Sequence, residues 1–396
     1  MPSGEPRPRA SRFALNLLAV ALAVLVALEP AAAAAKAHRR HHRPPPAAAV
    51  GQPAPGSMNS AAAVACGDKL HCWAVGLGAG ATAAVDATTD GGGTWRSQTL
   101  PTAVTVLAAV SCVGRRSCLA VGAAGATGAV TTTIDGGQSW ILAQDPAGAA
   151  ALTAVNCFSQ RRCLAIATDG TTSWSTLTND QGQTWNREGD LPAGMTATQA
   201  ACATSSLCLV VGFTVTGPGT GVGAVARSVD GGATWSAVTL PSGVGILRDV
   251  ACTESSCLAA GTPSTATTGF VAAGGLLLSS SDGGVTWQIA SAGVAHVDAF
   301  GVGCPQAKVC VVVGTDWAAS TPPQPSAGIV DTVDGGGSWR RATLKYVPVG
   351  LSSIACPTYN RCVGAGGNVL VSISLPVKAP KKPSKPNSRA GATGVR

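Results

Sequence analysis

The chain is poor in charged and in aromatic residues. Of its 396 residues, 12% are charged and 4% are Phe, Trp or Tyr, whereas 46% are hydrophobic. With a mean hydropathy of +0.27, such a chain can bury enough apolar surface to offset its ordering entropy, which excludes disorder for most of the length. The 50 Gly and 25 Pro argue against a mainly helical protein. The length provides a core for one large domain or two ordinary ones.

The central part of the chain also lacks a basic surplus. Residues 61–376 carry 14 Lys and Arg against 17 Asp and Glu, a net charge of −3, although the whole chain has +8. The positive charge lies at the ends, with +5 before residue 61 and +6 after residue 376. A slightly acidic body does not favour nucleic acid, so we expect no nucleic-acid partner.

The N-terminal end shows the pattern of an exported protein. Arginines precede the apolar run Phe13–Leu28, which leads into an Ala-rich segment. This pattern predicts a signal peptide or a retained N-terminal anchor over residues 1–37, and hence a secreted or extracytoplasmic protein. Residues 38–48 form a basic linker rich in Pro, His and Arg, and residues 377–396 a basic tail rich in Pro and Lys. We expect both to be unfolded and to bind anionic lipid or a wall polymer, giving membrane or wall association.

No cysteine is isolated in the sequence, because every one belongs to a close pair. Successive pairs lie 45 to 52 residues apart and the chain has only five His, so we expect no tetrahedral metal site and no cofactor. Disulfides within each pair are expected instead, as in proteins of an oxidising compartment. The seven pairs are Cys66 and Cys72, Cys112 and Cys118, Cys157 and Cys163, Cys202 and Cys208, Cys252 and Cys257, Cys304 and Cys310, and Cys356 and Cys362.

A repeat is the strongest signal in the chain. Six segments fit the pattern [S/T]-x-D-x-G-x-[T/S]-W, and their Asp and Trp are Asp90 and Trp95, Asp135 and Trp140, Asp180 and Trp185, Asp230 and Trp235, Asp282 and Trp287, and Asp334 and Trp339. This pattern is the Asp box. Residues 49–376 therefore resemble the Asp-box (BNR, sialidase-like) β-propellers, and in particular the repeats of the photosystem II stability and assembly factor type.

The residue types of the repeat have a structural explanation. Asp can accept hydrogen bonds from the backbone of a tight turn, Gly adopts positive φ there, and Trp packs between neighbouring units. A carboxylate held in a turn is unavailable for proton transfer, so we do not expect these Asp to be catalytic. Calcium is not expected either, because no D-x-[DN]-x-[DN]-G spacing occurs.

Each unit is expected to form four short antiparallel strands. The Cys pair would join the first two strands and the Asp box the last two, so that the units stack as propeller blades. Seven Cys pairs but only six Asp boxes are present, and the last unit lacks a fourth strand. We predict an all-β fold of seven blades, with residues 49–55 supplying the missing outer strand of blade 7; six blades is the alternative.

Length variation along the repeat predicts a binding face. Each box Asp precedes the next Cys by 22 residues, whereas the distance from a second Cys to its box Asp rises from 17 or 18 to between 22 and 25 in units four to six. Variable loops on a rigid scaffold often bind ligands, although these loops could equally be spacers rich in Gly, Thr and Pro. The candidate ligand residues are Phe213, Arg227, Phe270, Asp316 and Trp317.

Two further groups are candidates for function. The Cys hairpins carry Arg115, Arg116, Arg161, Arg162 and Arg361, which are either solvated turn residues or a patch for an anionic ligand. Asp249 and Asp298 lie on or next to strands that would line the central channel, where a carboxylate pair could hydrolyse a glycoside.

The resemblance leaves two kinds of function open. Sialidases of this fold use an R-I-P segment and a Tyr paired with Glu, but this chain lacks R-I-P and has only two Tyr, Tyr346 and Tyr359. The assembly-factor type implies a non-catalytic propeller that holds protein partners. We therefore expect an exported, monomeric platform that binds a protein or an envelope polymer. Extracytoplasmic carbohydrate binding or sialidase-like hydrolysis is the alternative.

Overall fold

A computed structural model describes residues 45–56, 58–217, 220–264, 274–290, 294, 297–317, 326–345, 347 and 350–377. All of them belong to the unit Pro44–Arg396, and the other unit, Met1–Arg43, lies outside the described residues. The predicted N-terminal segment, the linker up to residue 44 and the tail from residue 378 are therefore not described.

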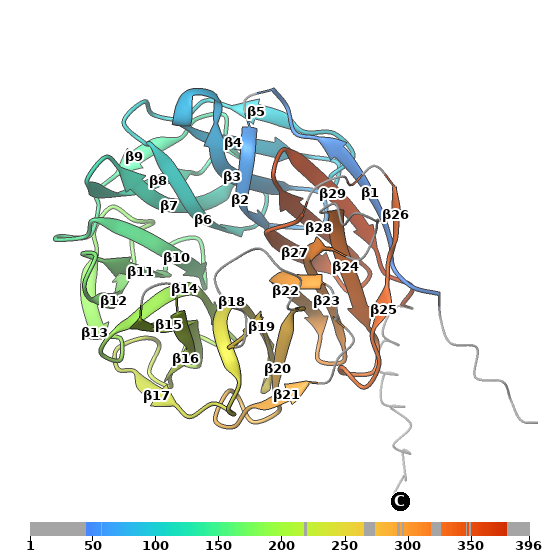
Figure 1. Cartoon of the computed structure of the whole chain (residues 1–396). Coiled ribbons are helices and arrows are strands. Elements are labelled where there is room, and N and C mark those ends of the chain that lie inside the picture. The colour runs from blue at the N-terminus through green and yellow to red at the C-terminus, as the bar shows by residue number, and fades with distance from the viewer. Residues whose placement is uncertain are drawn as a thin grey trace, which may run out of the picture. The chain divides into compact units, whose positions relative to one another are not determined.

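Seven sheets form the blades of a seven-bladed β-propeller (Figure 1), and within each blade consecutive strands pair antiparallel except for the parallel pair described below for blade 7. The inner strands of successive blades contact one another, and the inner strand of blade 7 contacts that of blade 1, which closes the ring. The prediction of seven blades is thus confirmed, and the alternative of six is wrong. Among the described residues the only helical element is a 3-10 turn, Ala79–Ala81.

In blades 1 to 6 the chain runs from the inner strand outward. The strands of blades 1 to 3 are β2 (Met58–Cys66), β3 (Cys72–Gly78), β4 (Ala83–Thr88) and β5 (Arg96–Gln98); β6 (Val106–Val113), β7 (Ser117–Ala124), β8 (Thr127–Thr133) and β9 (Ile141–Ala143); and β10 (Ala151–Cys157), β11 (Cys163–Thr168), β12 (Ser173–Thr178) and β13 (Asn186–Asp190). Those of blades 4 to 6 are β14 (Met195–Cys202), β15 (Cys208–Gly217), β16 (Thr220–Ser228) and β17 (Ser236–Val238); β18 (Val244–Thr253), β19 (Ser256–Pro263), β20 (Leu276–Ser280) and β21 (Gln288–Ala290); and β22 (Val297–Gln306), β23 (Val309–Asp316), β24 (Ser326–Thr332) and β25 (Arg340–Arg341).

Blade 7 is built from both ends of the described chain. Its sheet has the order β26-β1-β29-β28-β27, and its strands are β1 (Ala48–Pro53), β26 (Thr343–Lys345), β27 (Ser353–Thr358), β28 (Arg361–Gly366) and β29 (Val369–Ser374). β1 pairs antiparallel with β29, as predicted for residues 49–55. The sheet has one strand more than predicted, because the chain leaves blade 6 after β25 and continues as β26, parallel to β1.

A buried carboxylate fixes this crossing between blades 6 and 7. Asp331 of β24 accepts a hydrogen bond from the N–H of Ala47 at 3.0 Å and forms an ion pair with Arg340. The guanidinium of Arg340 also donates to the carbonyl of Pro45 at 3.0 Å. The segment before β1 is therefore held at the edge of blade 6, which closes the ring and covers an otherwise free strand edge.

The core consists of seven apolar clusters, one at each blade interface. Ala, Val and Leu from two adjacent blades fill each cluster, and the Trp five residues after each repeated Asp packs against the cluster shared with the preceding blade. Each blade also carries one disulfide between its first two strands, and the seven bonds have the predicted pairing.

Candidate functional site

The six turns that contain the repeated Asp, here called the Asp turns, use their carboxylates in hydrogen bonds. In the second blade, Oδ1 of Asp135 accepts from the Thr133 hydroxyl at 2.8 Å and from the Ser139 N–H at 3.0 Å, and Oδ2 accepts from the Ser139 hydroxyl at 2.6 Å. The same three bonds occur in all six turns. These bonds, the Ser139 hydroxyl first, lower the pKa of Asp135 to about 2. The carboxylate is thus engaged in the turn.

The central channel has a mainly polar surface. It encloses about 310 Å³ and is lined by the inner strands of all seven blades. Several side chains in it bridge adjacent blades: Ser111 accepts from the N–H of Cys157 at 3.0 Å, and Ser353 from that of Val64 at 3.2 Å. The channel lining therefore contributes to holding the ring together.

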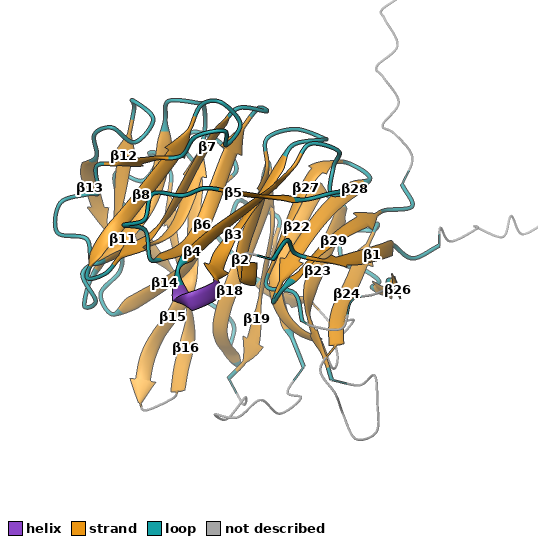
Figure 2. Ribbon diagram, turned by 90° about the horizontal axis from the view of Figure 1, so that it is seen from above, coloured by secondary structure: helices purple, strands orange, loops and turns teal. Residues whose placement is uncertain are grey.

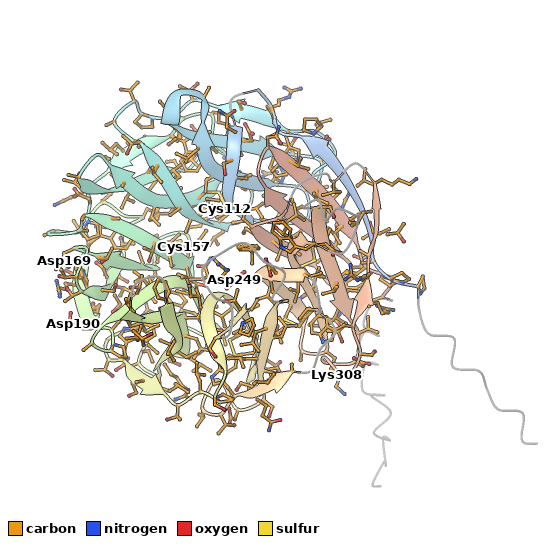
Figure 3. All side chains as sticks on the ribbon, viewed as in Figure 1. Cys112, Cys157, Asp169, Asp190, Asp249 and Lys308 are labelled. Atoms are coloured by element: carbon orange, nitrogen blue, oxygen red, sulfur yellow. A yellow bond between two sulfur atoms is a disulfide. The ribbon has the colours of Figure 1, made fainter. Side chains whose placement is uncertain are left out.

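Asp249 forms the same kind of bridge between blades, and its side chain is titratable (Figure 3). Its Oδ2 accepts from the N–H of Val302 in blade 6 at 2.8 Å, and its Oδ1 from that of Val250 at 2.8 Å. The side chain keeps some exposed surface toward the channel, but protein surrounds it, and this burial raises its pKa to about 7 although both hydrogen bonds act to lower it. Asp249 is thus a bridging carboxylate at the centre of the ring.

Bulges in the inner strands build the surface near the long loops. In six blades one extra residue interrupts the pairing of the first two strands, four positions before the first cysteine. A bulge redirects the local side chains. The extra residues are small in blades 1 to 4 and large in blades 5 and 6, in the order Ala62, Ala108, Thr153, Thr198, Arg248 and Phe300.

The two large bulge residues contact each other across the interface of blades 5 and 6. The guanidinium carbon of Arg248 lies 4.6 Å from the centre of the Phe300 ring. Asp298 is close enough for its charge to act on the Arg248 guanidinium, and the indole Nε1 of Trp317 donates to Oδ2 of Asp298 at 2.8 Å. We call Arg248, Asp298, Phe300 and Trp317 the loop-face cluster.

Arg248 is the chemically distinctive member of this cluster. It is half-buried, its Nε is buried without a hydrogen-bond partner, and its guanidinium makes no hydrogen bond to any other described residue. Burial lowers the pKa of Arg248, and the charge of Asp298 offsets part of that effect. A stacked guanidinium with free donors can bind a carboxylate in two-point geometry.

The structure does not bring together the candidate ligand residues that were predicted from the long loops. Trp317 belongs to the loop-face cluster, but the neighbouring Asp316 is buried and forms an ion pair with Arg341. Phe213 lies on β15 of blade 4, opposite Gly223. Phe270 lies outside the described residues.

Arg227 does not lie on the loop side of its blade. It immediately precedes the Asp turn at the end of β16, and its Nε donates to the carbonyl of Gly283 in the next Asp turn at 2.8 Å. The expectation that Arg227 lies with the long loops is therefore wrong. Arg227 lies at the Asp-turn end of its blade, where it links blades 4 and 5.

Asp249 and Asp298 have separate partners. Asp249 accepts from the backbone of Val302, whereas Asp298 accepts from Trp317. Nothing in these contacts joins them into a pair of carboxylates facing one space, as glycoside hydrolysis requires.

The sequence contained a signal for Arg248 and Phe300 that our sequence analysis missed. When the inner strands are aligned on the first cysteine, the position four residues earlier is small in blades 1 to 4 and in blade 7, where it is Ser352. Large or charged residues at that position in two adjacent blades break the pattern of the repeat, and such breaks are expected at functional sites.

Within the described ranges, no helical segment combines the length and apolarity needed to cross a membrane. In the same ranges no three His, Cys, Asp or Glu side chains gather in a way that would hold a metal ion.

Comparisons with known proteins identify the fold. No protein-family model matches the chain, and no curated protein matches it in sequence. Among solved structures, YCF48 bound to a D1 peptide is similar, with a TM-score of 0.59 and 17% identity over 83% of this chain and 96% of that one. YCF48 from Cyanidioschyzon merolae has a TM-score of 0.57 and 13% identity over 82% and 98%. A GH74 xyloglucanase from Xanthomonas campestris has a TM-score of 0.57 and 17% identity, over 85% of this chain but 55% of the enzyme.

These likenesses show a shared propeller architecture. The solved structures with this architecture include YCF48 with a bound D1 peptide and a GH74 xyloglucanase. At such low identity the fold carries no function across by itself.

Proposed function

We propose that this protein is an exported, non-catalytic β-propeller that binds a protein partner at the cell envelope through its loop-face cluster. The observation that carries the proposal is the half-buried guanidinium of Arg248, which is stacked on Phe300 and makes no hydrogen bond to another described residue. Its free donors suit an acidic side chain or a C-terminal carboxylate of a peptide. Trp317 adds an aromatic surface of the kind that dominates binding energy at protein interfaces.

The hairpin of β15 and β16 supports a protein partner on the same face. It extends beyond the other strands of the ring (Figure 2), and its side chains Val215 and Val222 are 61% and 50% exposed. Exposed apolar residues on a projecting strand pair are typical of protein contacts. That YCF48 was solved with a bound peptide agrees with such a use of the fold.

The hydrolase alternative receives less support. The carboxylates of the Asp turns are engaged, Asp249 bridges two backbone N–H groups, and Asp298 is bonded to Trp317. We therefore propose that these groups are structural, and that the six Asp turns are Asp boxes in the sense of the repeat family.

The place of action is part of the proposal. Seven disulfides suit an oxidising compartment outside the cytoplasm. The N-terminal apolar run supports export by a signal peptide or an anchor, and the basic ends support attachment to anionic lipid or a wall polymer.

A peptide array tests the role of Arg248. Oxidised full-length protein is bound to immobilised acidic peptides, each paired with a counterpart in which amides replace the carboxylates. We expect the acidic peptides to bind and Arg248→Met to weaken them by 10-fold or more, because a hydrogen bond to a charged group contributes about 1.5–3 kcal/mol.

Arg187→Met is the matched control. Arg187 also stacks on an aromatic ring, 4.0 Å from the centre of Trp174, but on the outer strand of blade 3 and paired with Asp190 (Figure 3). The Arg187→Met variant should bind the acidic peptides like the wild type. Equal binding by the Arg248→Met variant, or by the amidated peptides, would contradict the proposal.

A further inference from the structure

The interface of blades 5 and 6 contains a cavity of about 340 Å³ at its Asp-turn end. Strands β19 and β20 line one side, and the Cys hairpin and Asp turn of blade 6 line the other. This interblade pocket lies at the opposite end of the strands from the loop-face cluster. Its principal polar lining consists of Ser256, Ser279, Ser281, Gln288, Lys308 and Trp339.

Other blade interfaces fill the corresponding space with a long side chain. The residue before the second cysteine of a blade projects toward the Asp turn of the next blade, so Arg361 reaches Gly91 and Arg162 reaches Gly231. Between blades 4 and 5, Leu207 contacts Gly283 from the same position.

The interface of blades 2 and 3 is filled in a second way. Its Asp turn carries Gln181 where five other turns have Gly, and the Gln181 amide lies 3.4 Å from the Ser117 hydroxyl. Only about 10 Å³ remains there. The interface of blades 5 and 6 has Ser256 and Gly335 at the equivalent positions, which explains physically why it is open.

Five polar side chains around this opening have no hydrogen-bond partner within the described part of the chain. These are the side chains of Ser256, Ser279, Ser281, Gln288 and Lys308.

We propose that the interblade pocket binds a neutral sugar ring. The lining charges Lys308 and Asp334 cancel, and the hydroxyl and amide groups both donate and accept, as the hydroxyls of a sugar do. The indole of Trp339 supplies an aromatic wall against which the apolar side of a sugar can pack. The volume falls at the small end of ligand pockets, as a single hexose requires. This binding is independent of the peptide binding proposed for the loop face.

Titration calorimetry tests the proposal with glucose, galactose, mannose and N-acetylglucosamine, using glucuronate and glutamate as charged comparators. At least one neutral sugar should bind with a Kd on the order of 1 mM. This value corresponds to a ligand efficiency of about −0.3 kcal/mol per atom for a sugar of about twelve heavy atoms. The charged comparators should bind more than tenfold more weakly.

Two variants close the pocket with residues that the protein already uses in the same repeat positions. Ser256→Leu copies Leu207, and Gly335→Gln copies Gln181, which adopts a φ of 68° in its own turn. A Cβ on Gly335 would lie 3.7 Å from the Lys308 side chain, an ordinary contact. Both variants should keep the melting temperature within a few degrees and lower sugar affinity at least tenfold.

Gln181→Gly is the control, because it changes the same repeat position while leaving the pocket untouched. It should bind the sugar like the wild type. The proposal is overturned if no neutral sugar binds, if the charged comparators bind as well as the neutral sugars, or if both folded pocket variants bind with unchanged affinity.

Discussion

Asp249 should make the stability of the ring depend on pH. Burial raises the pKa of its carboxyl from 3.8 to about 7, so the folded state holds the proton more tightly than the unfolded state does. The stability contributed by this group is therefore fully present below pH 3.8 and is lost as the pH rises through 7.

The expected size follows from the same two values. A shift from 3.8 to about 7 corresponds to about 4 kcal/mol in total, of which about 2–3 kcal/mol falls between pH 5 and pH 8. This is an upper limit, because the side chain faces the channel and water there screens the charge.

The perturbation is Asp249→Asn, which removes the titration. The amide oxygen can accept only one of the two N–H groups that now bind the carboxylate, from Val250 and Val302. The variant should therefore lose about 1–3 kcal/mol at every pH through the unpaired N–H. The informative quantity is the slope of stability against pH, not this constant offset.

Guanidinium unfolding followed by Trp fluorescence, with the disulfides intact, measures that slope from pH 5 to pH 8. The stability of the wild type relative to the variant should fall as the pH rises. Asp135, Asp180 and Asp230 have pKa values of about 2 and do not titrate in this range. Parallel curves for the two proteins would refute the reasoning.

Two further predictions concern closure and the Asp turns. Deleting residues 45–56 removes β1, which covers β29 over six paired positions from Ala48 to Pro53, so calorimetry should show a lower melting temperature. A midpoint within about 2 °C of the wild type, on the order of 1 kcal/mol for a domain of this size, would count against closure by β1. Asp135→Ala removes three hydrogen bonds and should lower the free energy of unfolding in denaturant by about 1–3 kcal/mol. Asp145→Ala, outside the turn, should lower it by less than about 0.5 kcal/mol. Equal losses would mean that the turn bonds contribute nothing to stability.

The repeat made the fold predictable. Each blade is specified by local features that recur in register: a Cys pair that joins neighbouring strands, an Asp that closes a turn and a Trp that packs against the preceding blade. Even the closure by β1 could be predicted from the count of seven Cys pairs and six repeated Asp turns. The additional strand β26 could not, because it depends on where the outer strand of blade 6 ends.

The candidate sites were less predictable. Trp317 was identified from its loop and its partner Asp298 from its strand in the same blade, but the contact of Arg248 with Phe300 lies across a blade interface. Arg227 was grouped with the loops because it is near them in sequence, although it lies at the far end of its strand.

The sequence by itself determined the blades, their number and their disulfides, because these rest on interactions between residues close together along the chain and on a period that repeats. Only the tertiary structure decided where a ligand could bind. The stacked guanidinium of Arg248 and the open pocket at Ser256 and Gly335 each depend on which side chains of two adjacent blades meet. That meeting is set by bulges and by side-chain size across an interface, which no single repeat contains.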